Sequence, residues 1–206
     1  MSELNQALFV DFNGTMLTNE WGHLSRKKAT ELFILNLELL NQRNSETECT
    51  CESSELSIED YLWLVRFHEQ RAFTQAQFQK FIFTQSTQYP EMIQLVRWLK
   101  TQYGLKIDTA SIKGNELDEY RIRKFKLDRV TDSFISTCFV HIGTSDVDNF
   151  RNALDTAEVP VDQVLYIEKT PMLVEAAESL GIKSIFYKDY TSTRMELASF
   201  GLQVAQ

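Results

Sequence analysis

The sequence predicts an α/β fold in which a Rossmann-like parallel sheet carries an inserted helical bundle. From residue 89 onward, short apolar runs alternate with helical patterns, which is typical of a parallel sheet with helices on both faces. Residues 17–88 instead hold three helical patterns in succession, with no strand between them. A length of 206 residues suffices for one such domain with an insertion.

The first predicted element is a short buried strand that ends at Asp11. Residues 8–10 are apolar, and residues 11–14 read Asp-Phe-Asn-Gly, which favours a tight turn. The strand therefore delivers Asp11 to its carboxyl end.

The insertion is predicted to be a compact bundle with helices over residues 25–43, 57–67 and 75–84. Thr74 and Gln77 form the capping-box pattern that begins the third of these helices. Residues 44–55 are polar and rich in Ser, Thr and Glu, so we expect a mobile loop there.

After Pro90 the pattern changes to alternating elements. Helices are predicted over residues 91–103, 117–125, 146–157, 172–180 and 193–200, and strands over residues 106–111, 134–140, 163–168 and 183–187. Because the first strand joins the same sheet, we expect an α/β core of residues 1–16 and 89–206. The helical cap then spans residues 17–88.

Charge and hydropathy argue against nucleic acid and membrane as partners. The chain has 29 Asp and Glu against 21 Lys and Arg, a formal net charge of −8 that repels phosphate backbones and anionic lipids. No apolar run approaches the roughly 18 residues of a membrane span, and no basic leader precedes the first strand. We therefore expect a cytoplasmic protein with a small-molecule ligand, and the sequence leaves its oligomeric state open.

Polar residues follow the carboxyl ends of the predicted strands. In open α/β sheets, ligands bind outside these ends. The segments that meet there are residues 11–15, 111–114, 141–146 and 168–170. The sequence therefore predicts a ligand site at this edge of the sheet.

These segments resemble the motifs of the haloacid dehalogenase superfamily, in particular its helical-cap branch with many small-molecule phosphatases. The resemblance rests on the Asp-x-x-Gly-Thr loop of residues 11–15, on the helical insertion directly after it, and on Ser111 after a strand. It continues through residues 116–127, 132–140, 146–154 and 163–182. It implies a Rossmann-like core with an inserted helical cap.

The resemblance also implies residue roles. Asp11 matches the carboxylate that attacks phosphorus, so that one difficult step becomes two. Asn13 stands where the family usually has an Asp that acts as general acid and base, and an amide cannot carry that proton. Ser111 matches the hydroxyl that orients the phosphate.

Two further positions depart from the family pattern. Thr144 falls where a lysine usually neutralises the transferring group, and Lys169 falls where an acid usually binds Mg²⁺. An ammonium repels this cation and does not coordinate it. If magnesium is bound at all, its ligands are Asp11, Asn13 and Glu168; otherwise no cofactor is expected.

These departures favour a pseudo-hydrolase that binds a small phosphorylated or carboxylated ligand and turns it over weakly or not at all. One alternative is an active phosphatase that forms an aspartyl-phosphate at Asp11. Another is a metal-free hydrolase of the dehalogenase type. In each case the candidate ligand-binding residues are Lys113, Gly114, Thr144 and Lys169.

A basic cluster follows Ser111 in the sequence. It comprises Arg121, Arg123, Lys124 and Lys126, and we expect these side chains to form a solvated face of a helix.

Overall fold

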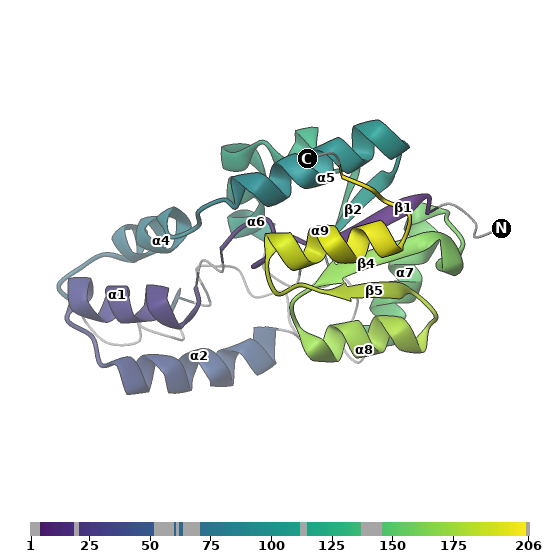
Figure 1. Cartoon of the computed structure of the whole chain (residues 1–206). Coiled ribbons are helices and arrows are strands. Elements are labelled where there is room, and N and C mark those ends of the chain that lie inside the picture. The colour runs from purple at the N-terminus through teal and green to yellow at the C-terminus, as the bar shows by residue number, and fades with distance from the viewer. Residues whose placement is uncertain are drawn as a thin grey trace.

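A computed structural model describes residues 5–18, 21–51, 60, 62–63, 71–111, 115–136 and 146–204. Its centre is a parallel five-stranded sheet in the order β3-β2-β1-β4-β5 (Figure 1). The strands are β1 (Ala7–Asp11), β2 (Lys106–Ser111), β3 (Ser133–Ser136), β4 (Val164–Glu168) and β5 (Lys183–Phe186). The predicted α/β fold class is confirmed.

Helices cover both faces of the sheet. On one face, α5 (Pro90–Tyr103) and α9 (Tyr190–Ser199) pack against Leu8 and Val10 of β1. On the other face, α7 (Asp146–Ala157) and α8 (Pro171–Ser179) pack with Phe9. A strand that is buried on both faces reads as a continuous apolar run, and this explains why the sequence predicted β1.

The other helices of the core lie between β2 and β4 in the sequence. Helix α6 (Asn115–Phe125) follows β2, and two short 3-10 helices span Leu127–Arg129 and Val161–Gln163. The predicted helices and strands of this half of the chain agree with the structure within about three residues at each described end. Residues 137–140 of the predicted third strand lie outside the described residues.

Among the described residues, three helices with defined bounds lie between β1 and α5, away from the sheet (Figure 1). They are α1 (His23–Phe33), α2 (Leu37–Cys51) and α4 (Gln75–Thr84). An apolar cluster, which also includes Leu117 of α6, holds them together: Phe33 and Trp21 both pack edge-on against Phe78, with ring centroids 5.0 and 5.6 Å apart. The chain enters and leaves this insertion side by side, because Leu17 and Gln88 form an antiparallel bridge.

The helix predicted over residues 25–43 is wrong, because the structure has two helices there. Ile34 ends α1 in the left-handed region, with φ 52°, and the side chain of Asn36 accepts a hydrogen bond from the Leu39 backbone N–H at the start of α2. Asn favours helix starts because its side-chain oxygen satisfies an unpaired N–H.

The loop expected over residues 44–55 is wrong over its first part, since α2 continues to Cys51. Helix propensity is a weak prior that tertiary context overrides. Residues 52–55, and most of the helix predicted over residues 57–67, lie outside the described residues. The capping box is confirmed, because the Gln77 N–H donates to Thr74 Oγ1 at 3.2 Å and the Thr74 N–H donates to Gln77 Oε1 at 2.8 Å.

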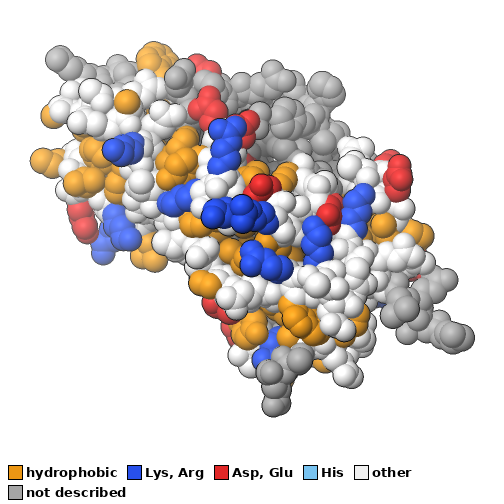
Figure 2. All heavy atoms as spheres, turned by 90° about the horizontal axis from the view of Figure 1, so that it is seen from above, with side chains coloured by type: hydrophobic (Ala, Val, Ile, Leu, Met, Phe, Trp, Pro, Cys, Tyr) orange, Lys and Arg blue, Asp and Glu red, His pale blue; other side chains and the backbone are white. Residues whose placement is uncertain are grey.

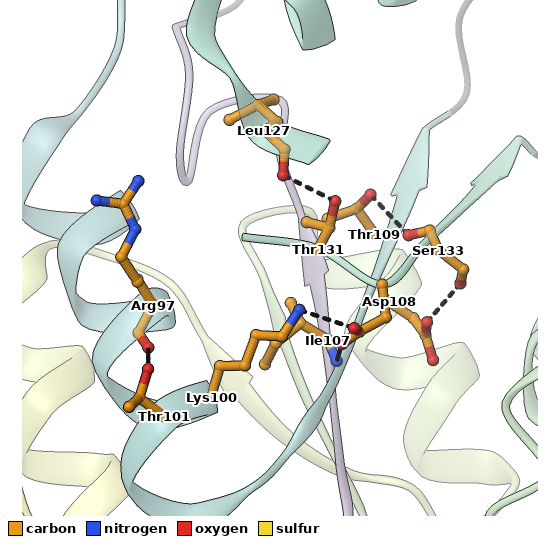
Figure 3. A network of polar contacts seen from close by, with 10 residues as sticks. Arg97, Lys100, Thr101, Ile107, Asp108, Thr109, Leu127, Thr131 and Ser133 are labelled. Carbon is orange, nitrogen blue, oxygen red and sulfur yellow. Dashed lines mark hydrogen bonds and ion pairs between the residues drawn. The ribbon is translucent and has the colours of Figure 1, made fainter. Parts of the chain in front are cut away.

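A polar network ties α5 to the amino ends of β2 and β3 (Figure 3). Asp132 accepts hydrogen bonds from Lys100 Nζ at 2.7 Å and from the Ile107 N–H at 2.8 Å. Burial raises the pKa of Asp132, but these two donors outweigh it and hold that pKa below its usual value. Beside it, the Ser133 hydroxyl donates to buried Asp108. Because this network lies at the end of the sheet away from Asp11, we assign it a structural role.

No helix in the described part of the chain is long and apolar enough to cross a membrane.

The left-handed Ile34 gives a stability prediction. A β-branched residue is strained there, and its side chain is 93% exposed, so Ile34→Gly loses little packing. We expect this change to raise the free energy of unfolding by about 1 kcal/mol, measured by urea unfolding of the full chain. The control is Leu32→Gly inside α1, where glycine should lower the unfolding free energy by about 1 kcal/mol. A loss of stability in Ile34→Gly would contradict the prediction.

Candidate active-site edge

Asp11 ends β1 at the carboxyl edge of the sheet, on a tight turn. The backbone N–H of Asn13 donates to Asp11 Oδ1 at 3.0 Å, and the Thr15 hydroxyl donates to the Asp11 backbone carbonyl. The turn closes where the Leu17 N–H donates to the Phe12 carbonyl at 2.8 Å. The sequence Asp-x-x-Gly-Thr therefore builds a rigid loop that fixes the Asp11 carboxylate.

Gly14 and Lys169 pack directly against each other in this loop. Gly14 has φ +89°, which favours glycine, and a Cβ added there would lie 2.5 Å from both Cδ and Cε of Lys169. The turn thus needs a glycine for its conformation and for the space that the lysine takes up. The Lys169 ammonium therefore lies against the loop that carries Asp11.

Glu168 ends β4, which pairs with β1, and both of its carboxylate oxygens accept hydrogen bonds from nearby donors. It is 1% exposed. Its Oε1 accepts from the backbone N–H groups of Lys169 and Thr170 at 2.8 and 2.7 Å, and its Oε2 accepts from the Tyr166 hydroxyl at 2.6 Å. Because Thr170 is the N-cap of α8, this carboxylate also sits at the positive end of a helix.

The pKa of Asp11 lies well above its usual value. Burial raises it most, and the negative charge of Glu168 raises it further. The hydrogen bond from Asn13 and the positive charges of Lys169 and Arg121 lower it, but they do not compensate. The protonated form of Asp11 is thus favoured compared with an exposed aspartate.

Arg121 is buried at this site, so its predicted place on a solvated helix face is wrong. Its side chain is 0% exposed, and its Nη1 donates to Asn13 Oδ1 at 2.5 Å. Its Nη2 donates to the Thr18 carbonyl at 3.2 Å, and its guanidinium lies over the Phe12 ring, 4.8 Å from the centroid. Buried Leu117 lies four residues earlier in α6, and this spacing on one helix face was the signal for burial.

The other three members of the predicted basic cluster behave as expected. Arg123, Lys124 and Lys126 are exposed, and the Arg123 guanidinium pairs with Glu119 at 2.8 Å. Figure 2 shows Lys and Arg side chains gathered on the face of the molecule that is seen from above.

The structure brings Asp11, Asn13, Glu168 and Lys169 to one edge of the sheet. Ser111 ends the neighbouring strand, one residue beyond the Ala110 that pairs with Asp11, so its backbone lies at the same edge. Lys113, Gly114 and Thr144 lie outside the described residues.

Magnesium does not fit the described residues of this edge. They contain no group of three or more His, Cys, Asp or Glu placed to hold a metal. Both Glu168 oxygens accept from protein donors, and Asn13 Oδ1 accepts from Arg121. The Lys169 ammonium lies beside the remaining carboxylate, and its charge opposes that of a cation.

These elements define the class of protein: a Rossmann-like α/β protein with an aspartate at the end of its first strand and a helical insertion directly after it. Solved structures share this fold. A dehalogenase with an intermediate complex is 19% identical, with a TM-score of 0.68, and covers 91% of this chain and 86% of its own. The HAD family enzyme bt-2542 of Bacteroides thetaiotaomicron, in complex with magnesium and inorganic phosphate, is 14% identical, with a TM-score of 0.68, and covers 92% and 98%.

The chain therefore has the fold of the haloacid dehalogenase superfamily, as the resemblance in the sequence implied. No protein-family profile matches the chain. No curated protein matches it.

The raised pKa of Asp11 predicts a pH-dependent effect of Asp11→Asn on stability. Above the folded-state pKa, ionised Asp11 is disfavoured by burial and by Glu168, so removing its charge should raise the melting temperature at neutral pH. At acid pH, below the unfolded-state pKa, Asp11 is protonated in both states and the gain should vanish. Thermal unfolding of both proteins over a pH series measures this. A gain that grows as the pH falls would show that the pKa of Asp11 is lowered.

Proposed function

We propose that the carboxyl edge of the sheet binds a small phosphorylated or carboxylated ligand without magnesium, and that hydrolysis there is impaired or lost. The observation that carries this proposal is the packing of Lys169 against Gly14. It puts a positive charge beside the Asp11 loop, where the family resemblance expects a metal-binding acid.

The charge of Lys169 supports binding of an anion in place of a cation. An ammonium has three donors and no acceptor, so it suits phosphate or carboxylate oxygens. It occupies the space next to Gly14 that a side chain at position 14 would enter. In this proposal the ammonium supplies the attraction for the ligand that a metal supplies elsewhere in the superfamily.

The state of Asp11 supports a loss of hydrolysis. A carboxyl group attacks phosphorus or carbon only when it is ionised, and burial together with Glu168 raises the pKa of Asp11. A protonated carboxyl can instead donate a hydrogen bond to an anion. Asn13 adds to the impairment, because its amide carries no proton to the leaving group.

The structural relatives support the class of ligand. The bt-2542 structure contains inorganic phosphate, bound together with magnesium. Our proposal for this chain keeps the phosphate-type anion and leaves out the metal. The predicted cap of residues 17–88 remains the part that we propose to select the rest of the ligand.

The proposal predicts metal-independent binding of inorganic phosphate or acetate. We expect calorimetric titration to give the same affinity for one of these anions with EDTA and with added Mg²⁺. Lys169→Gln should weaken that affinity at least about tenfold, a loss of about 1.4 kcal/mol. The control Lys28→Gln removes the same charge from an exposed position of α1 and should leave the affinity unchanged.

Two turnover assays decide between the proposal and the alternatives. Hydrolysis of an aryl phosphate at about 1 per second or faster, lost in Asp11→Asn, would establish a phosphatase. Metal-independent halide release from a 2-haloacid, lost in the same variant, would establish a dehalogenase-type hydrolase. Either result would overturn the proposed impairment.

A further inference from the structure

Resting on the proposed anion site, we infer that Arg121 is a positioning residue that makes Asn13 a hydrogen-bond donor to the bound anion. Its guanidinium holds the amide oxygen of Asn13, and the amide nitrogen is then left to face the ligand. The position that carries a proton-transferring acid in the family pattern becomes an anion-binding donor in this chain.

Contacts other than Asn13 fix the guanidinium. Asp118 Oδ1 lies 3.4 Å from Nη1, and the Thr18 carbonyl accepts from Nη2 at 3.2 Å. The Phe12 ring packs against the flat face of the group, with the centroid 4.8 Å away. Because a charge that is 0% exposed needs such partners, Arg121 has little freedom to turn toward solvent.

This fixed donor decides which way the Asn13 amide points. A guanidinium has only donors, so the atom that faces it at 2.5 Å must be the amide oxygen. The NH₂ group then points away from Arg121. Among the hydrogen bonds between described residues, none uses Asn13 Nδ2, although Asn13 is only 9% exposed.

The amide lies on the same turn as Asp11. The backbone N–H of Asn13 donates to Asp11 Oδ1 at 3.0 Å, so the two side chains belong to one rigid loop. An anion at this loop would accept from the Asn13 NH₂ group and from the Lys169 ammonium. An aspartate at position 13 would pair with Arg121 but would turn an acceptor, and a negative charge, toward the ligand.

The shared chemistry of the ligand is an anion with acceptor oxygens, from a phosphate or from a carboxylate. We therefore propose to titrate ¹⁵N-labelled protein separately with inorganic phosphate and with acetate. The Asn13 side-chain signals, identified by their absence in Asn13→Asp, should shift in wild type with one of the two anions. The anion that shifts them identifies the class of ligand.

The variants test the role of Arg121. Arg121→Met should weaken the affinity for that anion at least about tenfold and remove the shift of the Asn13 NH₂ signals. The control Arg123→Gln changes a side chain that is 79% exposed on the same helix. It should alter neither the affinity nor the shift of the Asn13 NH₂ signals. Arg121→Lys keeps the charge but replaces the planar guanidinium, which donates from two nitrogens, with a single ammonium. It should therefore still weaken the affinity.

Two further variants keep the inference testable if Arg121→Met does not fold. Asn13→Ala removes the donor and should weaken the affinity about as much as Arg121→Met, and Asn13→Asp should weaken it more. Unchanged affinity in Asn13→Ala, or Asn13 NH₂ signals that do not shift in wild type, would overturn the inference and leave the proposed function standing. If the wild-type protein binds neither anion, the inference and the proposed function are both wrong.

Discussion

The buried guanidinium of Arg121 is the interaction on which the rest of the site depends. It joins helix α6 to the turn after β1 through Asn13, and to the chain entering the helical insertion through the Thr18 carbonyl. A buried charge is costly unless it is paired and hydrogen-bonded, so the loop must keep the conformation that supplies these acceptors. The orientation of the Asn13 amide and the start of the insertion are thus set by one side chain.

Glu168 and Lys169, the last residue of β4 and the residue after it, stand where the family pattern has a pair of acids. Glu168 turns inward, where the N–H groups before α8 and the Tyr166 hydroxyl satisfy its oxygens. Lys169 turns to the Asp11 loop and packs on Gly14. Glu168 therefore accepts from the N–H groups at the start of α8, and Lys169 carries the charge that the proposed anion would meet.

The sequence predicted the sheet because its strands are buried on both faces and read as apolar runs between turns. It predicted the edge of the site for the same reason, since Asp11 and Glu168 follow such runs directly. It did not predict the end of α1, because Ile34 is neither Gly nor Pro and still adopts a left-handed conformation. It did not predict the burial of Arg121, because arginines on helices are usually solvated. Only the hydrogen-bonding partners around Arg121 compensate for the desolvation of its charge.

The charges at this edge are compatible with the proposed anion although several acids lie there. Lys169 and Arg121 carry two positive charges, and Glu168 and Asp118 carry two negative ones, so these four balance. An ionised Asp11 is then the excess negative charge that opposes the ligand. Burial and Glu168 raise the pKa of Asp11, which disfavours this extra negative charge. In the proposed function, the same burial and the same neighbour that disfavour an ionised Asp11 nucleophile also favour an anion at this edge.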